Sequence, residues 1–403
     1  MAETNDIKPL DGMRVLELGT FLAGPYTCTQ LGEFGAEVIK VEMPKVGDPT
    51  RRYGLATDAG ASVVWLSEAR NKKSITLDLR TGEGAEIALE LARTCDVVVE
   101  NFQPGTLEKW GLGWDSFKKV NQRLVMVRIS GFGQTGPYRD RPGFGRVGNA
   151  FGGLSYLAGY PDRPPVTPGS ATIADYLAGI HGTIGAMMAL KSVEKTGEGQ
   201  VVDIGLYEPI FRILDELAPS YDLTGFVRGR VGPRSVNAAP HSHFETGDGR
   251  WLGIACTSDK IFARLATLVG EPKVANDGKW GTYPQRKADL EALEAWVTNW
   301  TKSMSRDEVI SACEGAQVPC GPIYAIDEIF EDPQYAAREN IKRVEDPRLG
   351  SLAVPNVVPK LTQTPGEIKW LGQDLGQSNN EIFGGLLGLS EERLAELRDK
   401  NVI

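Results

Sequence analysis

Short apolar runs alternate with helical patterns over the first 130 residues. The runs predict strands at 15–18, 37–41, 75–79, 96–100 and 124–130. Helical patterns cover 26–34 and 82–93, and Gly35 follows the first of them as a stop signal. Strands that alternate with helices form parallel sheets, whose ligands bind at the carboxyl ends of the strands. The pattern therefore predicts a doubly wound α/β domain.

The pattern changes after residue 130. Residues 131–169 are rich in Gly, Pro and Arg and have little periodicity, which is typical of a functional segment. A long helical pattern follows over 170–190. Its small residues recur at steps of three and four, at Ala178, Gly179, Gly182, Gly185, Ala186 and Ala189. This spacing gives the helix one small-residue face against which another backbone packs closely.

Asp175 stands near the start of that helix. A carboxylate in the first turn is stabilised by backbone N–H groups and by the positive end of the helix dipole, so we expect it to stay ionised. Such a residue is either a helix cap or a charged group presented to a ligand. The stretch by itself leaves both interpretations open.

The remaining pattern predicts a second, smaller α/β unit. Residues 1–223 form the first part of the large domain, and the polar stretch 224–239 is a linker. The small domain covers 240–325 and opens with a hairpin around Gly247-Asp248-Gly249. Residues 326–403 are predicted to return to the large domain and complete it.

Composition narrows the function. The chain has 403 residues, 41% of them hydrophobic, and a net charge of −9, which disfavours a nucleic acid or an anionic membrane as the main partner. The five cysteines form no CxxC pair, which suits a reducing compartment and argues against a metal site. The polar N-terminus has no apolar signal core, and no apolar run is long enough to span a bilayer. We therefore expect a soluble cytoplasmic protein.

Several motifs are weak by themselves. GxGxxG occurs at 131–136 and 143–148, but the first is followed by Pro137 rather than a helix, and the first βα loop at 19–25 lacks it. This disfavours a nicotinamide dehydrogenase, and we interpret the glycines as flexible loops over a ligand. The basic cluster at 70–73 is either a phosphate contact or a solvated turn. No GxSxG supports a hydrolase.

Five stretches together resemble the class III CoA-transferases, the family of formyl-CoA transferase and carnitine CoA-transferase. They are VLEL with AGP at 15–18 and 23–25, GAEVIKVE at 35–42, NKKSI at 71–75, DVVVENF at 96–102 with PG at 104–105, and Asp175 in its helix. The resemblance implies an α/β fold with a Rossmann-like large domain and a smaller α/β domain. It also implies an interlocked-ring dimer, formed with a second copy or with a homologous subunit.

The resemblance implies site residues as well. Asp175 becomes the catalytic nucleophile, which attacks an acyl-CoA thioester and forms an aspartyl-CoA thioester. The positions that match the CoA site are Phe21, Leu22, Ala23, Lys72, Lys73, Asn101, Phe102 and Lys109, the last standing where the family often has Arg. Coenzyme A enters as a substrate thioester, and neither a tightly bound cofactor nor a metal is expected.

The stretch 240–249 resembles the branch that uses succinyl-CoA as donor and a dicarboxylic acid as acceptor. Malate, citramalate, mesaconate, glutarate and aryl-substituted succinates all fit this class, and the formyl-CoA and oxalate pair is the alternative. A second substrate carboxylate requires a cation or hydrogen-bond donors. The candidates are Arg52, Arg146, His241 and His243.

The α-methylacyl-CoA racemases resemble the chain nearly as well. They use a catalytic His in a Gly-His-Asp string, which here reads Gly143-Phe144-Gly145. With Phe144 in place of the base, exchange of the α-proton loses one of the two acid–base groups that it requires. A catalytically dead partner subunit is disfavoured because Asp175 is present.

Overall fold

The computed structural model describes residues 7–170, 172–276 and 278–403 and divides the chain into two compact units. The first contains Met1–Ser155, Gly169–Gly225 and Ala337–Ile403, and the second contains Tyr156–Pro168 and Phe226–Ala336. The second unit thus includes most of the stretch predicted as a linker, together with 156–168. Arg230 ties these parts together, because its guanidinium donates to the carbonyl oxygens of Tyr156 and Tyr160.

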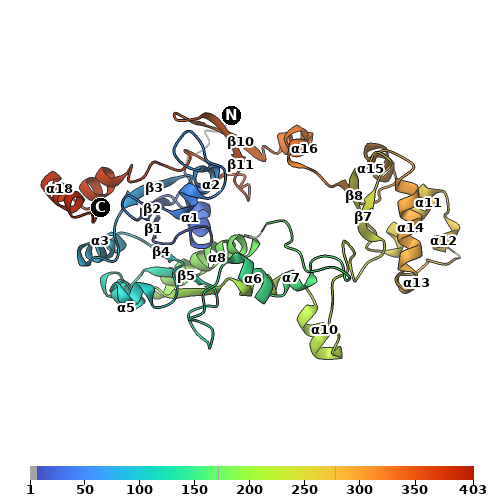
Figure 1. Cartoon of the computed structure of the whole chain (residues 1–403), viewed down its shortest axis with the longest axis horizontal. Coiled ribbons are helices and arrows are strands. Elements are labelled where there is room, and N and C mark those ends of the chain that lie inside the picture. The colour runs from blue at the N-terminus through green and yellow to red at the C-terminus, as the bar shows by residue number, and fades with distance from the viewer. Residues whose placement is uncertain (1–6, 171, 277) are drawn as a thin grey trace. The chain divides into compact units, whose positions relative to one another are not determined.

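A six-stranded parallel sheet forms the centre of the first unit (Figure 1). Its strands are β1 (Arg14–Glu17), β2 (Glu37–Glu42), β3 (Lys72–Thr76), β4 (Val97–Glu100), β5 (Val125–Ser130) and β6 (Val201–Gly205). Their order is β3-β2-β1-β4-β5-β6, so the direction of winding reverses between β1 and β4. This confirms the predicted parallel sheet and places a ligand crevice at the carboxyl ends of β1 and β4.

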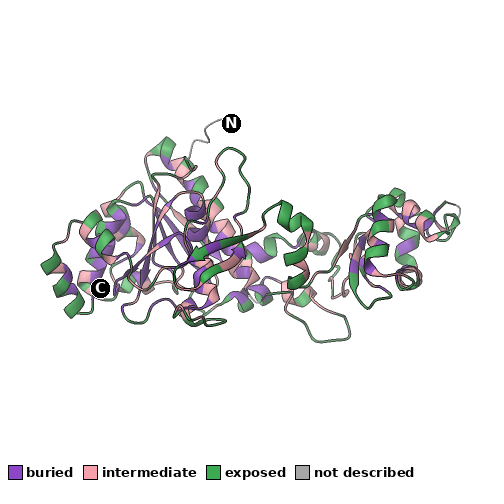
Figure 2. Cartoon of the chain, turned by 90° about the horizontal axis from the view of Figure 1, so that it is seen from above, coloured by how far each residue is buried: buried purple, intermediate pink, exposed green. Residues whose placement is uncertain are grey.

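Helices cover both faces of the sheet. On one face lie α1 (Ala23–Glu33) and α8 (Ile173–Thr196), and on the other lie α3 (Gly82–Arg93) and α5 (Trp114–Val120) (Figure 1). Side chains that alternate along β1, β4 and β5 enter the two apolar cores in turn, which leaves the strands buried (Figure 2). The C-terminal residues Leu394, Leu397 and Val402 complete the core on the α3 face.

Short elements connect these layers in the first unit. They are η1 (Pro49–Arg52), α2 (Val63–Glu68), α4 (Thr106–Lys109), α6 (Gly145–Phe151), α9 (Tyr207–Arg212) and α10 (Leu217–Thr224), and the short α7 (Leu154–Leu157) crosses the boundary between the two units. The returning segment adds the antiparallel pair β10 (Ile341–Asp346) and β11 (Gly350–Pro355), a π-helix η2 (Asn380–Leu386) and α18 (Glu391–Asp399).

The second unit has its own core. An antiparallel sheet of β7 (His241–Glu245), β8 (Trp251–Ala255) and β9 (Cys320–Pro322) packs with helices around Phe244, Leu252 and Phe262. The hairpin predicted around 247–249 is confirmed as the connection between β7 and β8. The helices are α11 (Asp259–Val269), α12 (Lys273–Asn276), α13 (Tyr283–Ala288), α14 (Leu290–Thr301), α15 (Arg306–Gly315), α16 (Ile326–Glu331) and α17 (Pro333–Ala337).

The small-residue face of α8 lies against α1. A Cβ atom on Gly179 would lie 2.9 Å from the carbonyl oxygen of Ala23, and one on Gly182 would lie 2.3 Å from Thr27 Oγ1. Thr27 Oγ1 also donates to the carbonyl oxygen of Gly179 at 3.0 Å. The predicted close approach is therefore confirmed, and it fixes the helix that carries Asp175 against the helix that follows β1.

Helix α8 is the one helix among the described residues that is long and apolar enough to cross a membrane by length and composition, a test that core helices also pass, and here it packs on α1 and β5. The structure corrects the interpretation of the basic cluster as a solvated turn. Arg70 and Lys72 are buried rather than solvated, since Arg70 pairs with Glu33 and Lys72 with Glu17. Strand β3 begins at Lys72, three residues earlier than predicted.

Candidate active site

A cavity of about 250 Å³ opens at the carboxyl edge of the sheet. Its walls come from the loop after β1, the ends of β4 and β5, the segment 143–146, the residue that follows β6, and the start of α8. Asp175 and Asn101 both lie in this wall, together with the loop that follows β1, so the wall takes residues from both sides of the reversal between β1 and β4. The cavity therefore lies where the strand order places a ligand site.

Asp175 is the third residue of α8, and the N-cap position belongs to Thr172. The helix-cap interpretation is therefore wrong, and the carboxylate is one wall of the cavity. Burial raises the pKa of Asp175 to about 6, while its hydrogen bond to its own backbone acts in the opposite direction. The carboxylate is mostly ionised at neutral pH, as expected, but its solvation is poor, which favours reaction with an electrophile.

The raised pKa predicts an acidic limb in the rate. Only the ionised carboxylate is a nucleophile, so kcat/KM should fall about tenfold for each pH unit below about 6 and level off above about 7. Measuring kcat/KM between pH 4.5 and 8.5, with a parallel check that the protein stays folded, tests this. If kcat/KM instead begins to fall only near pH 4, Asp175 is solvated as an ordinary carboxyl group is.

The first loop is held in one conformation at the cavity. Thr20 N–H donates to Asn101 Oδ1, and Asn101 Nδ2 donates to the Thr20 carbonyl oxygen, both at 2.7 Å. Phe21 adopts a left-handed conformation with φ of 65° and stacks edge-on against Tyr53 at 5.5 Å between ring centroids. Asn101 thus bridges the ends of β1 and β4 and positions the loop rather than only lining the cavity.

Helix α1 begins in the cavity wall at Ala23 and has no side-chain cap. The N–H groups of its first turn, from Ala23 and Gly24, therefore remain for other acceptors, while Pro25 carries no N–H. Phe21, Leu22 and Ala23 all contribute to the wall, where the CoA site was expected. The uncapped start of α1, at Ala23, and the Asp175 carboxylate consequently share one cavity.

The two glycine-rich strings meet each other at the cavity. A Cβ atom on Gly131 would lie 2.8 Å from Gly143 Cα, so only glycine permits this approach of the two backbones. The second string is not a flexible loop throughout, because α6 begins within it at Gly145. Phe144 is 70% exposed and lines the cavity in the position where the racemases have their base. No histidine lines this cavity among the residues described.

The other predicted contacts separate into three groups. Arg146 lines the cavity with Asp175. Lys72, Lys73, Phe102, Lys109 and Arg52 are not part of its wall in the described structure; Lys72 is buried against Glu17, and Lys73 lies between Glu37 and Glu381. The ammonium of Lys72 is therefore unavailable to a nucleotide here. His241 and His243 belong to the second unit, on β7.

Sequence reasoning missed Tyr53, Ser130 and Thr172, which also line the cavity. Ser130 is the last residue of β5, so its place at the carboxyl edge follows from the predicted strand; the other two required the fold. In the part of the chain that the structure describes, no three His, Cys, Asp or Glu side chains gather as a metal site requires.

These features define a class: an α/β protein with a partly buried carboxylate in a cavity at the carboxyl edge of a parallel sheet. A family model described as CoA-transferase family III matches residues 10–379. The chain therefore belongs to the class III CoA-transferases, and the predicted family is confirmed.

Relatives agree over the full length. The chain is 47% identical over 396 residues to the succinyl-CoA–L-malate CoA-transferase alpha subunit of Chloroflexus aurantiacus, covering 98% of this chain and 92% of that one. It is 46% identical over 403 residues to the succinyl-CoA–D-citramalate CoA-transferase of the same species, covering all of both. The crystal structure of a CAIB/BAIF family protein from Brucella suis is similar, with a TM-score of 0.83, 34% identity, and 94% and 99% of the two chains covered.

Proposed function

We propose that this chain transfers CoA from succinyl-CoA to a dicarboxylic acid, through a thioester on Asp175. The observation that carries the proposal is the half-buried carboxylate in the cavity wall. The exchange reaction needs neither a metal nor a general base, because every attacking group in it is already an anion. In this proposal the large domain is Rossmann-like, with its ligand at the point where the strand order reverses.

The exchange proceeds in four balanced steps. Asp175 attacks the thioester carbonyl and expels the CoA thiolate, which leaves a mixed anhydride. The thiolate attacks the Asp175 carbonyl, releases succinate and forms the aspartyl-CoA thioester. The acceptor carboxylate attacks that same carbonyl and expels the thiolate again, which leaves a second anhydride. The thiolate then attacks the acceptor carbonyl, forms the new acyl-CoA and frees Asp175.

The cavity contains the groups that these steps require. Each tetrahedral intermediate carries an oxyanion, and the N–H groups of Ala23 and Gly24 at the uncapped start of α1 are candidate donors. Both anhydrides hydrolyse if water reaches them, so the crossing of Gly131 and Gly143 is suited to closing one side of the site.

Arg146 is the candidate partner of the second acceptor carboxylate, because it lines the same cavity as Asp175. In Arg146→Gln we expect the rate with malate, citramalate or glutarate to fall about tenfold or more, while a monocarboxylic acceptor loses much less. Initial rates of CoA transfer from succinyl-CoA to such a panel test this. Equal loss with both kinds of acceptor would remove Arg146 as a determinant of specificity.

The same assay tests the proposed function itself. We expect CoA transfer from succinyl-CoA to at least one dicarboxylic acid. Transfer from formyl-CoA to oxalate alone would replace the substrates but keep the mechanism. Loss of stereochemistry from an α-methylacyl-CoA, without any transfer, would overturn the proposal in favour of a racemase despite Phe144.

A dimer is the second part of the proposal. Large apolar side chains on α8 and at the end of α9 are exposed in the single chain: Ile184, Met187, Met188, Phe211 and Ile213. Such a surface on one protein is suited to a second chain of the same fold, and the L-malate relative is itself named as an alpha subunit. The mass of the native protein and its subunit composition distinguish a single chain, a dimer of like chains and a dimer of unlike chains.

A further inference from the structure

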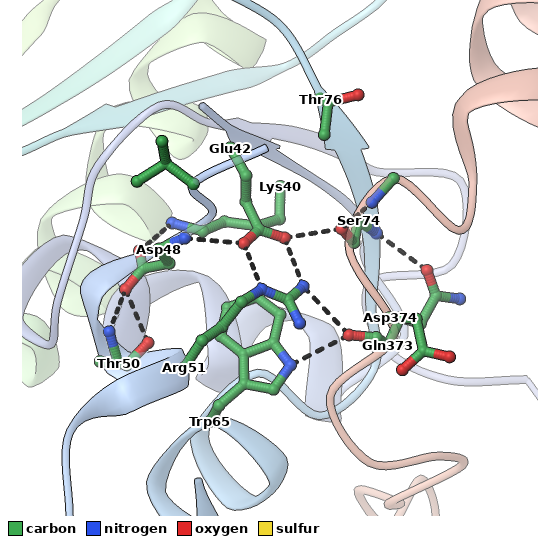
Figure 3. A network of polar contacts seen from close by, with 12 residues as sticks. Lys40, Glu42, Asp48, Thr50, Arg51, Trp65, Ser74, Thr76, Gln373 and Asp374 are labelled. Carbon is green, nitrogen blue, oxygen red and sulfur yellow. Dashed lines mark hydrogen bonds and ion pairs between the residues drawn. The ribbon is translucent and has the colours of Figure 1, made fainter. Parts of the chain in front are cut away.

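A buried polar network joins β2 to the residues that follow it in the chain (Figure 3). Lys40 and Asp48 are 1% and 2% exposed, and their side chains pair at 2.8 Å between Nζ and Oδ2. Lys40 Nζ also lies 3.0 Å from Glu17 Oε1. The catalytic scheme uses none of these three side chains. Because burying an ion pair carries a large desolvation cost, the pair is expected to have a structural or functional role.

The pair reaches the cavity loop at two points. Lys40 Nζ donates to the carbonyl oxygen of Gly19, and Phe21 N–H donates to Asp48 Oδ1 at 3.3 Å. Asn101 holds Thr20, the residue between them, at both its N–H and its carbonyl oxygen. Two consecutive peptide groups of the loop, Gly19–Thr20 and Thr20–Phe21, are therefore each held at both the carbonyl oxygen and the N–H, by side chains from β2, from the start of η1 and from the end of β4.

Asp48 is in turn held rigidly. Its Oδ1 accepts from Thr50 N at 2.8 Å and from Thr50 Oγ1 at 2.6 Å, and its own N–H donates to Glu42 Oε2 at 2.8 Å. Glu42 is fixed by Arg51, which binds both of its oxygens at 2.7 Å (Figure 3). Burial acts to raise the pKa of Asp48, but Lys40 and Thr50 more than offset this and hold the pKa below its usual range.

The loop needs such support because Phe21 is strained. A non-glycine residue with φ of 65° persists only where its surroundings enforce that conformation, and such strain gathers at functional sites. Phe21 also lies one residue before Leu22, the N-cap of α1, and the uncapped helix start at Ala23 shares the cavity with Asp175. A change of conformation at Phe21 would move the ring and this helix start together.

We propose that Lys40 and Asp48 are positioning residues for acyl transfer: they hold Gly19 to Phe21 so that the Phe21 ring and the start of α1 keep their places opposite Asp175. This inference rests on the proposed function, because it assigns the network to the same cavity. It predicts that weakening the network slows the chemical step before it unfolds the domain.

The test is Asp48→Asn, measured against Glu33→Gln. An asparagine at position 48 has one acceptor oxygen, and its other polar atom is an NH₂ donor. The oxygen can accept hydrogen bonds either from Phe21 and Thr50 or from Lys40, but not from both sides. Glu33 is a matched control, since it is 3% exposed and pairs with Arg70 at 2.6 Å at the far end of α1, away from the cavity. Both variants break one buried ion pair in the same unit.

We expect kcat of Asp48→Asn to fall about 10- to 100-fold. The KM for the carboxylic acid should change less than about threefold and the acidic limb near pH 6 should stay, because the surroundings of Asp175 are unchanged. Glu33→Gln should lose comparable thermal stability and keep wild-type kcat. Equal kcat values in Asp48→Asn and wild type, or equal losses in both variants, would overturn the positioning role.

Thr50→Val keeps the inference testable if Asp48→Asn does not fold. It removes one hydrogen bond to Asp48 Oδ1 and leaves the ion pair with Lys40 intact. We expect an intermediate loss of kcat, about three- to tenfold, and an unchanged kcat would count against the proposal. A wild-type chain that transfers CoA to no acceptor would instead contradict the proposed function, so the two failures are distinguishable.

Discussion

Asp175→Asn should abolish CoA transfer, with kcat at least about 10³-fold below wild type, because an amide cannot attack the thioester or form the anhydride. Wild type incubated with succinyl-CoA, without acceptor, should carry a CoA adduct on the peptide that contains Asp175. The variant should carry none. Mass spectrometry of the digested protein measures this directly.

The same variant should be at least as stable as wild type. The folded pKa of Asp175 is about 6, above the ordinary value of 3.8, so ionisation costs the folded state stability that is lost as pH rises from about 4 to about 6. Removing the charge recovers on the order of 3 kcal/mol at pH 7, at about 1.4 kcal/mol for each pKa unit. An inactive variant whose melting temperature equals or exceeds that of wild type would show that the Asp175 carboxylate serves function and not stability.

Asp175→Glu is the control for geometry. It keeps the charge but moves the carboxylate by about one methylene, and a displacement of about 1 Å at a reacting group costs on the order of 100-fold in rate. We expect a small residual activity and a detectable adduct. Full activity in Asp175→Asn, or an adduct on another residue, would mean that Asp175 is not the nucleophile.

The sequence predicts best the features that depend on local pattern. Apolar runs are sufficient to place the strands of the parallel sheet, because strands buried on both faces are continuously apolar. The small residues of α8 predict its close packing, since three- and four-residue steps share one face of a helix. Asp175 is singled out by resemblance to a family, and its pattern alone suggests a cap, which the structure contradicts.

Residues paired across the fold are the ones that sequence reasoning misplaces. The sequence alone suggests that Lys72 is an exposed cation. In the structure it pairs with Glu17, which lies 55 positions earlier in the chain, and the pair is buried between β1 and β3. Asp48 follows a short turn and has no distinctive pattern. Its importance depends on Lys40 and on the backbone of Phe21, contacts that exist only once the loop is folded over β2.

Gly182→Leu should prevent the large domain from folding. Even a Cβ atom at Gly182 would lie 2.3 Å from Thr27 Oγ1 and 3.3 Å from Thr27 Cγ2, and a leucine would force α1 and α8 apart. Gly182→Ala is a milder substitution whose effect on stability can be measured. Helix propensity favours Ala by about 1 kcal/mol, but overpacking costs about 1–3 kcal/mol. Thr27 would also lose its hydrogen bond to Gly179. We expect a net loss of stability, measured by thermal or denaturant unfolding.

The control is Gly82→Ala, the same substitution at the start of α3, where an added Cβ meets nothing within 4 Å. It should leave stability unchanged or raise it by a few tenths of a kcal/mol. The activity of Gly182→Ala should fall more than its folded fraction does, because α1 carries the cavity loop and α8 carries Asp175, so widening their contact separates donors from nucleophile. If Gly182→Ala and Gly82→Ala behave alike, the close contact between α1 and α8 does not set the geometry of the site.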